Sequence, residues 1–256
     1  MKILSPAIGL AISLSYLNLR ACHQRNCPTF SEIPEAVGDL INLQHLTICG
    51  YKLNYNLSVI NFNANKLTGG ISGSIGNLKR LLALEISSNN LTGPIPMEFY
   101  DLKELKYLDL EGNKLEGFVL ANIFSLSKLE KIDLSGNNFV GSIPDDIDHS
   151  FQLNDLCLSK NSFTGRIPES ISRFESLCIL DLSMNKFTGS IPVTIASMHH
   201  LEYMDVSQNL LTGSIPEAMF NLAFLYYLNL SQNNLSGEIP VVPCYKRFGP
   251  LKVFET

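Results

Sequence analysis

One phrase recurs through most of this chain at a fixed spacing of 24 residues. Leu180–Pro192 reads LDLSMNKFTGSIP, and Met204–Pro216, 24 residues later, reads MDVSQNLLTGSIP. Each copy carries one asparagine at the same place, which gives the series Asn65, Asn89, Asn113, Asn137, Asn161, Asn185, Asn209 and Asn233. A glycine follows four residues after each asparagine. A period of this length predicts a stack of similar structural units rather than an irregular globule.

The apolar positions of the phrase predict a short strand in every copy. Counted from the asparagine Asn185, Leu180 and Leu182 stand at positions −5 and −3. This alternation predicts a strand with one buried face, so the residues at −6, −4 and −2 point away from the core. A second apolar set stands at +10 and +13, such as Ile171 and Phe174 counted from Asn161, and closes the opposite side. One copy cannot bury both sets alone, so we expect successive copies to cover each other.

The polar and turn-forming positions have physical roles of their own. The asparagine amide offers two donors and an acceptor, so it can satisfy backbone groups where the chain turns inward. The glycine suits a turn with positive φ. A proline after the glycine fixes φ where the chain becomes extended again. We therefore interpret the eight asparagines as a structural ladder.

The repeated phrase LxxLxxLxLxxNxLxGxIP resembles the plant-specific class of leucine-rich repeat, over residues 12–240. That class includes receptor-like proteins and receptor-like kinases of the cell surface, and the secreted polygalacturonase-inhibiting proteins. The resemblance implies an α/β repeat solenoid. Its parts would be a right-handed leucine-rich repeat superhelix with a concave parallel β-sheet, a short flanking second sheet, and 3-10 or helical turns on the convex side.

The domain boundaries follow from this register, which is regular from residue 57 onward. Two earlier segments, Leu14–Cys22 and Leu46–Leu53, also fit the strand phrase and bring the count to about ten repeats, but their spacings are abnormal. Residues 1–21 fit either a secretory signal peptide or an irregular first strand. Residues 241–256 are expected to form an incomplete C-terminal flank, because the family's paired-cysteine cap has only Cys244 to match it.

Cysteines and glycosylation motifs bear on the compartment. Cys22 and Cys27 are close enough in sequence to form a disulfide in an oxidising compartment, and no CxxC spacing indicates a zinc site or redox dithiol. Four N-x-S/T motifs occur, at Asn56, Asn90, Asn229 and Asn234. With the family's outward-facing members, these features predict a secreted, cell-wall or plasma-membrane-associated glycoprotein. Beyond the N-terminus, no apolar run is long enough to be a transmembrane segment.

Charge and motifs argue against two other classes of function. The formal net charge of −5 argues against a nucleic-acid-binding protein, which usually carries a basic stripe. No GxSxG motif or kinase catalytic loop occurs, and GGISGSIG (Gly69–Gly76) lacks the residues of a phosphate-binding loop. We expect a chain that is not an enzyme and needs no cofactor or metal.

The concave face is the candidate binding surface. Its rows at −6, −4 and −2 combine tyrosines, which offer contact area and a polar tip, with carboxylates that would steer a basic partner. An alternative interpretation is that Asp at −4 and Ser at −2 are only the polar residues of a strand surface. The candidate ligand-binding residues are Tyr107, Asp109, Glu111, Lys131, Asp133, Asp155, Asp181, Tyr203, Asp205 and Tyr227.

Three functional hypotheses are compatible with the sequence. The first is an extracellular recognition protein of plant receptor type, in defence or developmental signalling, whose partner is a peptide, a protein or a co-receptor kinase. The second is a secreted inhibitor of fungal polygalacturonases, whose partner would be a pathogen enzyme. The third is a truncated ectodomain fragment of a receptor-like serine/threonine kinase.

Overall fold

The computed structural model describes residues 58–239 apart from 62, 65, 66, 72 and 148–151, together with the backbone of three strands at 16–19, 45–48 and 251–252. Five candidate positions fall outside the described residues: Asn56, Asn65, Cys22, Cys27 and Cys244. The signal-peptide interpretation likewise falls outside them. The chain divides into two units, residues 1–116 and 117–256.

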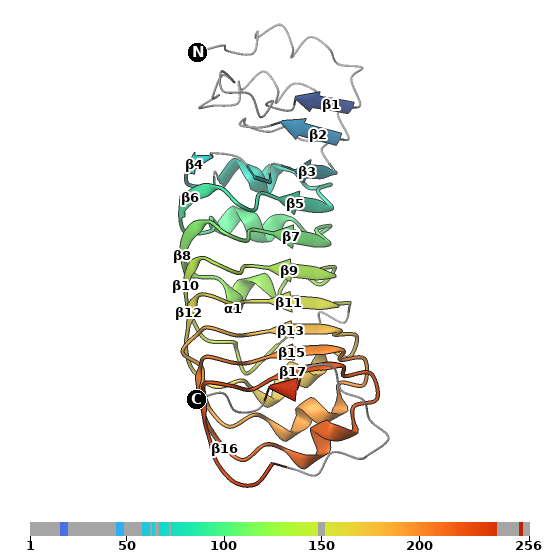
Figure 1. The fold of residues 1–256 in the computed structure, drawn as a ribbon. Helices are drawn as coiled ribbons and strands as arrows, with labels where there is room; N and C mark the ends of the chain where they lie inside the picture. Colours follow the sequence, from blue (N-terminus) through green and yellow to red (C-terminus); the bar gives the residue numbers. More distant parts are fainter. Residues whose placement is uncertain are drawn as a thin grey trace, which may run out of the picture. The chain divides into compact units, whose positions relative to one another are not determined.

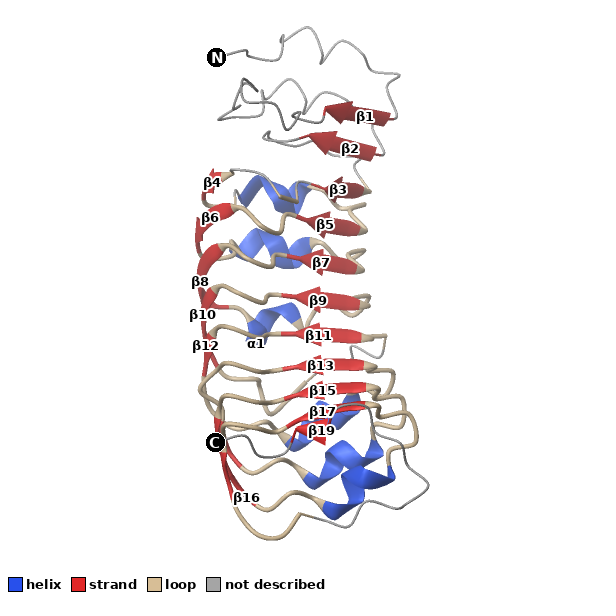
Figure 2. Cartoon of the chain, in the orientation of Figure 1, coloured by secondary structure: helices blue, strands red, loops and turns tan. Residues whose placement is uncertain are grey.

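The first unit has a parallel main sheet with the strand order β1-β2-β3-β5-β7 (Figure 1). Its strands are β1 (Tyr16–Leu19), β2 (His45–Ile48), β3 (Val59–Asn61), β5 (Ala83–Glu85) and β7 (Tyr107–Asp109). A second set of parallel strands comprises β4 (Thr68–Gly69), β6 (Asn90–Gly93) and β8 (Lys114–Phe118). Two short 3-10 helices, η3 (Gly73–Asn77) and η4 (Met97–Asp101), join the two sets (Figure 2).

The second unit repeats this plan, with main-sheet order β9-β11-β13-β15-β17-β19. These strands are β9 (Lys131–Asp133), β11 (Asp155–Cys157), β13 (Ile179–Asp181), β15 (Tyr203–Asp205), β17 (Tyr227–Asn229) and β19 (Leu251–Lys252). The second set comprises β10 (Asn138–Gly141), β12 (Ser162–Phe163), β14 (Thr188–Gly189), β16 (Leu210–Gly213) and β18 (Asn234–Leu235). The helical turns are α1 (Leu120–Ile123), η5 (Glu169–Arg173), η6 (Val193–Ser197) and η7 (Glu217–Asn221).

Strand pairing follows the sequence period, which confirms the predicted repeat solenoid. Between β13 and β15, Leu180 pairs with Met204 and Asp181 with Asp205, each residue lying beside the one 24 positions later. The abnormal spacings do not disturb this order. Leu17 pairs with Leu46, and Leu46 with Ile60, so the irregular length is taken up outside the strands. Among the described residues, no helix is long and apolar enough to cross a membrane.

The core is built from the positions that the periodicity marks as apolar. Leu180, Leu182 and Ile171 are fully buried, as expected for the two apolar sets of the repeat. At position +2, buried phenylalanines stack between neighbouring copies. The ring centroids of Phe163 and Phe187 lie 6.3 Å apart with nearly parallel planes. Each copy therefore covers the apolar side of the next, which no copy could do alone.

The asparagine amides bridge neighbouring copies through the backbone. The Nδ2 group of Asn185 donates to the carbonyl of Leu158 in the preceding copy at 2.9 Å, and its Oδ1 accepts the N–H of Phe163 at 3.0 Å. The same Nδ2 donates to two carbonyls of its own copy, those of Leu182 and Ser183. Asn209 makes the equivalent set of contacts one copy later. These amides pair backbone groups that would otherwise be buried without partners.

A left-handed residue precedes each described asparagine of the ladder. The φ angle at this −1 position is +53° at Met184 and +54° at both Ser88 and Gln208. Only two members of this series, Gly112 and Gly136, are glycines. The positive φ turns the chain off the strand so that the asparagine side chain points inward. Non-glycine residues carry strain of about 1 kcal/mol there, which the asparagine contacts offset.

Candidate ligand-binding face

The side chains at −6, −4 and −2 of the main-sheet strands form a surface that we call the outer face. The residue between each −6 and −4 pair, such as Leu180 or Met204, is fully buried, so its two neighbours in the strand point to the other side. All ten candidate ligand-binding residues lie on this face. Tyr107, Asp109 and Glu111 belong to the first unit, and Lys131, Asp133, Asp155, Asp181, Tyr203, Asp205 and Tyr227 to the second.

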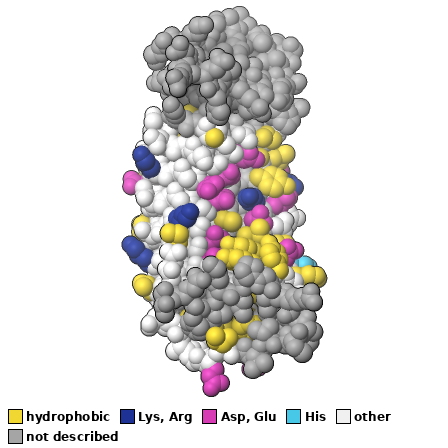
Figure 3. All heavy atoms as spheres, in the orientation of Figure 1, with side chains coloured by type: hydrophobic (Ala, Val, Ile, Leu, Met, Phe, Trp, Pro, Cys, Tyr) yellow, Lys and Arg dark blue, Asp and Glu magenta, His cyan; other side chains and the backbone are white. Residues whose placement is uncertain are grey.

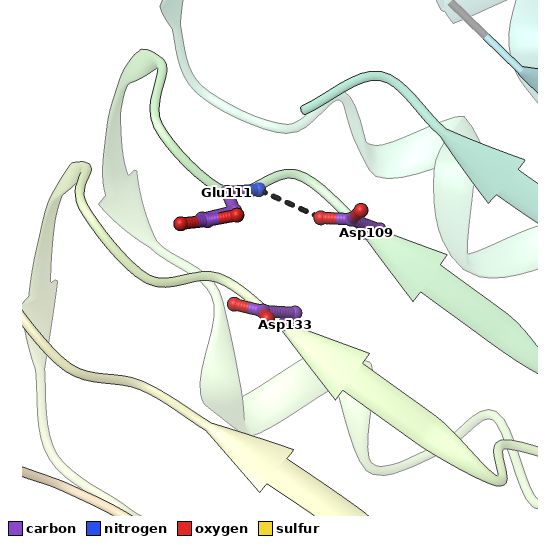
Figure 4. A group of neighbouring side chains, drawn as sticks. All are labelled: Asp109, Glu111 and Asp133. Atoms are coloured by element: carbon purple, nitrogen blue, oxygen red, sulfur yellow. Dashed lines mark hydrogen bonds between the residues drawn. The ribbon is translucent and has the colours of Figure 1, made fainter. Parts of the chain in front are cut away.

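The −4 carboxylates have a structural role in ending the strands. One oxygen of Asp181 accepts the backbone N–H of Ser183 at 3.0 Å, and one oxygen of Asp205 accepts that of Ser207 at 2.9 Å. Figure 4 shows the equivalent bond of 3.1 Å from the Glu111 N–H to Asp109, and it labels Asp133 at the same −4 position of its own strand. The acids at −4 therefore stabilise the turns after β7, β9, β13 and β15, as the alternative interpretation of the sequence allowed.

This role leaves the second carboxylate oxygen of each acid for other contacts. In the second unit, Oδ2 of Asp205 accepts hydrogen bonds from Asn229 Nδ2 at 3.0 Å and from the Tyr227 hydroxyl at 3.4 Å. Asp181 differs, because among the described residues no hydrogen bond or ion pair uses its Oδ2. Asp181 is half-buried, whereas Asp205 is only 7% exposed.

Two tyrosines stack on the outer face of the second unit. Tyr203 and Tyr227 pair directly across β15 and β17. Their ring centroids lie 4.3 Å apart with an interplanar angle of 3°. This separation is close to the spacing of neighbouring strands, so the parallel register alone brings the rings together. The hydroxyl of Tyr227 lies over Asp205, which joins the aromatic pair to the acid row.

Negative potential dominates this part of the outer face. Burial raises the pKa of Tyr203, and the nearby carboxylates of Asp181 and Asp205 raise it further. Burial likewise raises the pKa of the Cys157 thiol, with added contributions from Asp133, Asp181 and Asp155. Lys131 is the basic residue among the candidates, and its Nζ lies 3.9 Å from a carboxylate oxygen of Asp155. Figure 3 shows hydrophobic side chains gathered beside acidic ones in the lower half of the face drawn.

The outer face of the first unit has fewer candidate ligand-binding residues than that of the second. Tyr107 is 42% exposed, without a second tyrosine at the same position of β3 or β5, where Val59 and Ala83 stand. Asp109 and Glu111 provide two neighbouring carboxylates on the outer face of this unit. Asn61 donates a hydrogen bond to Glu85 in the same row.

The glycosylation motifs differ in their surroundings. The side chains of Asn90 and Asn234 are exposed at the start of β6 and β18. Asn229 instead lies half-buried on the outer face, where its Nδ2 donates to Asp205 and its Oδ1 accepts from the N–H and hydroxyl of Ser231. The sequence places Asn229 at −4, in the same row as the acids, although it is not one of the ten candidate ligand-binding residues. Its bonds to Asp205 and Ser231 depend on the folded strands and could not be predicted from the row alone.

Two family matches cover most of the repeated region. The family described as "Leucine rich repeat" matches residues 55–115, 96–139 and 175–235. A second match, "Leucine Rich Repeat", covers residues 152–174. No curated protein sequence matches the chain.

The similar solved structures include ectodomains of plant receptor kinases. A structure described as a TDR receptor is 32% identical, with a TM-score of 0.74 over 93% of this chain and 38% of that chain. The Arabidopsis receptor kinase HAESA, in complex with the peptide hormone IDA and the co-receptor SERK1, is 28% identical, with a TM-score of 0.76 over 98% of this chain and 51% of that chain. The chain thus spans between 38% and 51% of the length of these two receptor chains.

Another similar structure has a different role. A plant ice-binding protein is 28% identical, with a TM-score of 0.59 over 83% of this chain and 71% of that chain. The same fold therefore occurs in proteins with different ligands, and the function of this chain has to be argued from its outer face.

Proposed function

The chain belongs to the leucine-rich repeat family, and we propose that it is an extracellular recognition module of plant receptor type. Its ligand is a peptide or protein that lies on the outer face of the main sheet. We assign it no catalytic role. The proposal rests on the similarity to the HAESA structure, and this similarity extends over 98% of this chain. That structure contains a peptide hormone and a co-receptor.

The construction of the outer face supports the same role. The leucines, phenylalanines and asparagines of the repeat hold the copies together, because these side chains are buried or bonded to the backbone. The residues at −6 do not hold the copies together in this way. Their type varies, as Lys131, Asp155, Ile179 and Tyr203 show. Their side chains are partly exposed. A regular scaffold that displays a variable row of side chains suits recognition of an extended partner.

A matched pair of substitutions tests which side of the repeat binds. Ile179→Arg places a bulky charge on the outer face, and Val193→Arg makes the same kind of change in η6, where Val193 is 65% exposed. The wild-type chain is screened by surface plasmon resonance against synthetic secreted plant peptides and co-receptor ectodomains. We expect bound partners to be lost from the Ile179→Arg variant and kept by the Val193→Arg variant.

The proposal has clear contrary outcomes. It is wrong if no peptide or ectodomain in the screen binds, or if Ile179→Arg leaves every detected interaction unchanged. Circular dichroism and thermal melting of both variants provide the folding control. Both replaced residues are β-branched aliphatics that become arginine, so a difference between the variants reports location rather than residue type.

A further inference from the structure

We propose that the outer face around Tyr203 and Asp181 is a subsite for an arginine side chain of an extended, basic peptide. This inference deepens the proposed function and rests on it, since it names the chemistry of the ligand on that face. The stacked tyrosines, the open carboxylate oxygen and the charge balance of the second unit support it.

The aromatic pair supplies a flat platform, with one ring face of Tyr203 against Tyr227 and the other toward β13. Tyr203 and Tyr227 stack on each other, so one ring face of Tyr203 is occupied. On the other side of Tyr203 the neighbouring residue in the row is Ile179, which pairs with it across β13 and β15. A guanidinium group is planar and weakly hydrated, and it stacks on aromatic rings more readily than an ammonium group.

The carboxylate of Asp181 lies beside this platform. Its Oδ1 is occupied by the backbone N–H and hydroxyl of Ser183, and among the described residues nothing donates to its Oδ2. Asp181 and Asp205 pair across β13 and β15, so two carboxylates stand at neighbouring positions under the tyrosine row. Neither forms an ion pair with a described residue of the second unit, where the basic partners are Lys131 with Asp155 and Arg173 with Asp146.

Charge complementarity favours a cationic ligand at this subsite. From β9 to β15 the −6 and −4 rows carry Asp133, Asp155, Asp181 and Asp205 against one basic residue, Lys131. Farther along the −4 row, Lys252 of β19 pairs with Asn229. Burial is the main cause of the raised pKa values of Tyr203 and Cys157, and the neighbouring carboxylates raise both further. An anionic or purely apolar ligand would cover Oδ2 of Asp181 without supplying a donor, whereas a cationic ligand neutralises this carboxylate.

The chain itself supplies conservative variants for a test. Asp181→Asn removes the charge and keeps an Oδ1 that can accept from Ser183, as Asn229 already does from Ser231 at the same position. Tyr203→Ile removes the aromatic platform and repeats the residue found at 179. Asp109→Asn is the matched control, because it removes the same charge from the same kind of turn in the first unit.

The probe is an acetylated and amidated peptide of alternating serine and arginine, which when extended places its arginines on one side. Affinity is measured by isothermal titration calorimetry at physiological ionic strength. We expect Asp181→Asn and Tyr203→Ile each to weaken binding roughly fivefold or more, and Asp109→Asn to have a smaller effect. Replacing arginine by lysine should weaken binding, and replacing it by uncharged citrulline should abolish it.

Two results would overturn the inference. Equal losses for Asp181→Asn and Asp109→Asn would mean that diffuse charge rather than this subsite attracts the peptide. Undiminished binding of the citrulline peptide to the wild-type chain would exclude recognition of a cation, and this arm requires no variant to fold. Neither result would touch the proposed function, which is tested separately by the binding screen and by the Ile179→Arg and Val193→Arg pair.

Discussion

Replacing one ladder asparagine tests how the copies are held together. In Asn185→Ala, the N–H of buried Phe163 loses its acceptor, Oδ1 of Asn185, which lies 3.0 Å away. The carbonyls of Leu158 and Leu182 keep other partners, the amides of Asn161 and Asn209. The loss is therefore one orphaned donor, worth about 2 kcal/mol, and three bonds from Nδ2 whose net worth together is about 1–2 kcal/mol. We expect the free energy of unfolding to fall by about 3–4 kcal/mol.

Urea denaturation followed by circular dichroism measures this change. With a slope of about 2 kcal/mol per molar urea, the transition of the affected unit should move down by about 1.5–2 M. Contacts in a repeat protein are mainly between neighbours, so the loss is expected to be local and to broaden the transition. Asn138→Ala is the control, since Asn138 is exposed and its loss should change the free energy by less than about 0.5 kcal/mol. Similar midpoints for the two variants would refute the ladder argument.

Three further predictions concern single positions. When the chain is secreted from a eukaryotic host, glycopeptide mass spectrometry should find glycans on exposed Asn90 and Asn234. It should find none on Asn229, whose Nδ2 is hydrogen-bonded to a carboxylate. A fully glycosylated Asn229 would contradict the outer-face geometry. Met184→Ile should lower the free energy of unfolding by about 1–2 kcal/mol, because a β-branched residue is strained at a φ of +53°, whereas Met184→Gly should not; equal urea midpoints would contradict this. Because burial raises the pKa of Cys157, less of this thiol should be ionised at pH 8.5 than of an unperturbed thiol. Cys157 should therefore react more slowly with iodoacetamide in the folded chain than in the unfolded chain. Equal rates in the two states would contradict the burial.

Much of the fold was predictable because its determinants lie within one period. The −5 and −3 leucines define the strands, and the 24-residue spacing defines which residues pair, as Leu180 and Met204 show. The left-handed −1 residue was not predicted, since Met184, Lys160 and Gln208 are not residue types that favour positive φ. Their conformation is imposed by the asparagine contacts that follow them, which local preference does not reveal.

Other features depend on contacts between copies and could not be seen from one copy alone. Strand β19 was not predicted, because Leu251 follows Leu228 by 23 residues rather than 24 and its segment lacks the asparagine of the phrase. The structure nevertheless pairs Leu228 with Leu251. The outer-face candidates were predicted as rows of tyrosines and acids. The capping role of Asp181 and the joining of Tyr227, Asp205 and Asn229 emerge only when neighbouring strands are placed side by side.

Ligand binding on the outer face of the main sheet should be visible by hydrogen–deuterium exchange of the chain, measured with and without a peptide or ectodomain identified in the binding screen. We expect protection on binding to recur every 24 residues, in segments containing strands such as β13, β15 and β17. Protection confined to segments containing the helical turns η5, η6 and η7 would contradict it.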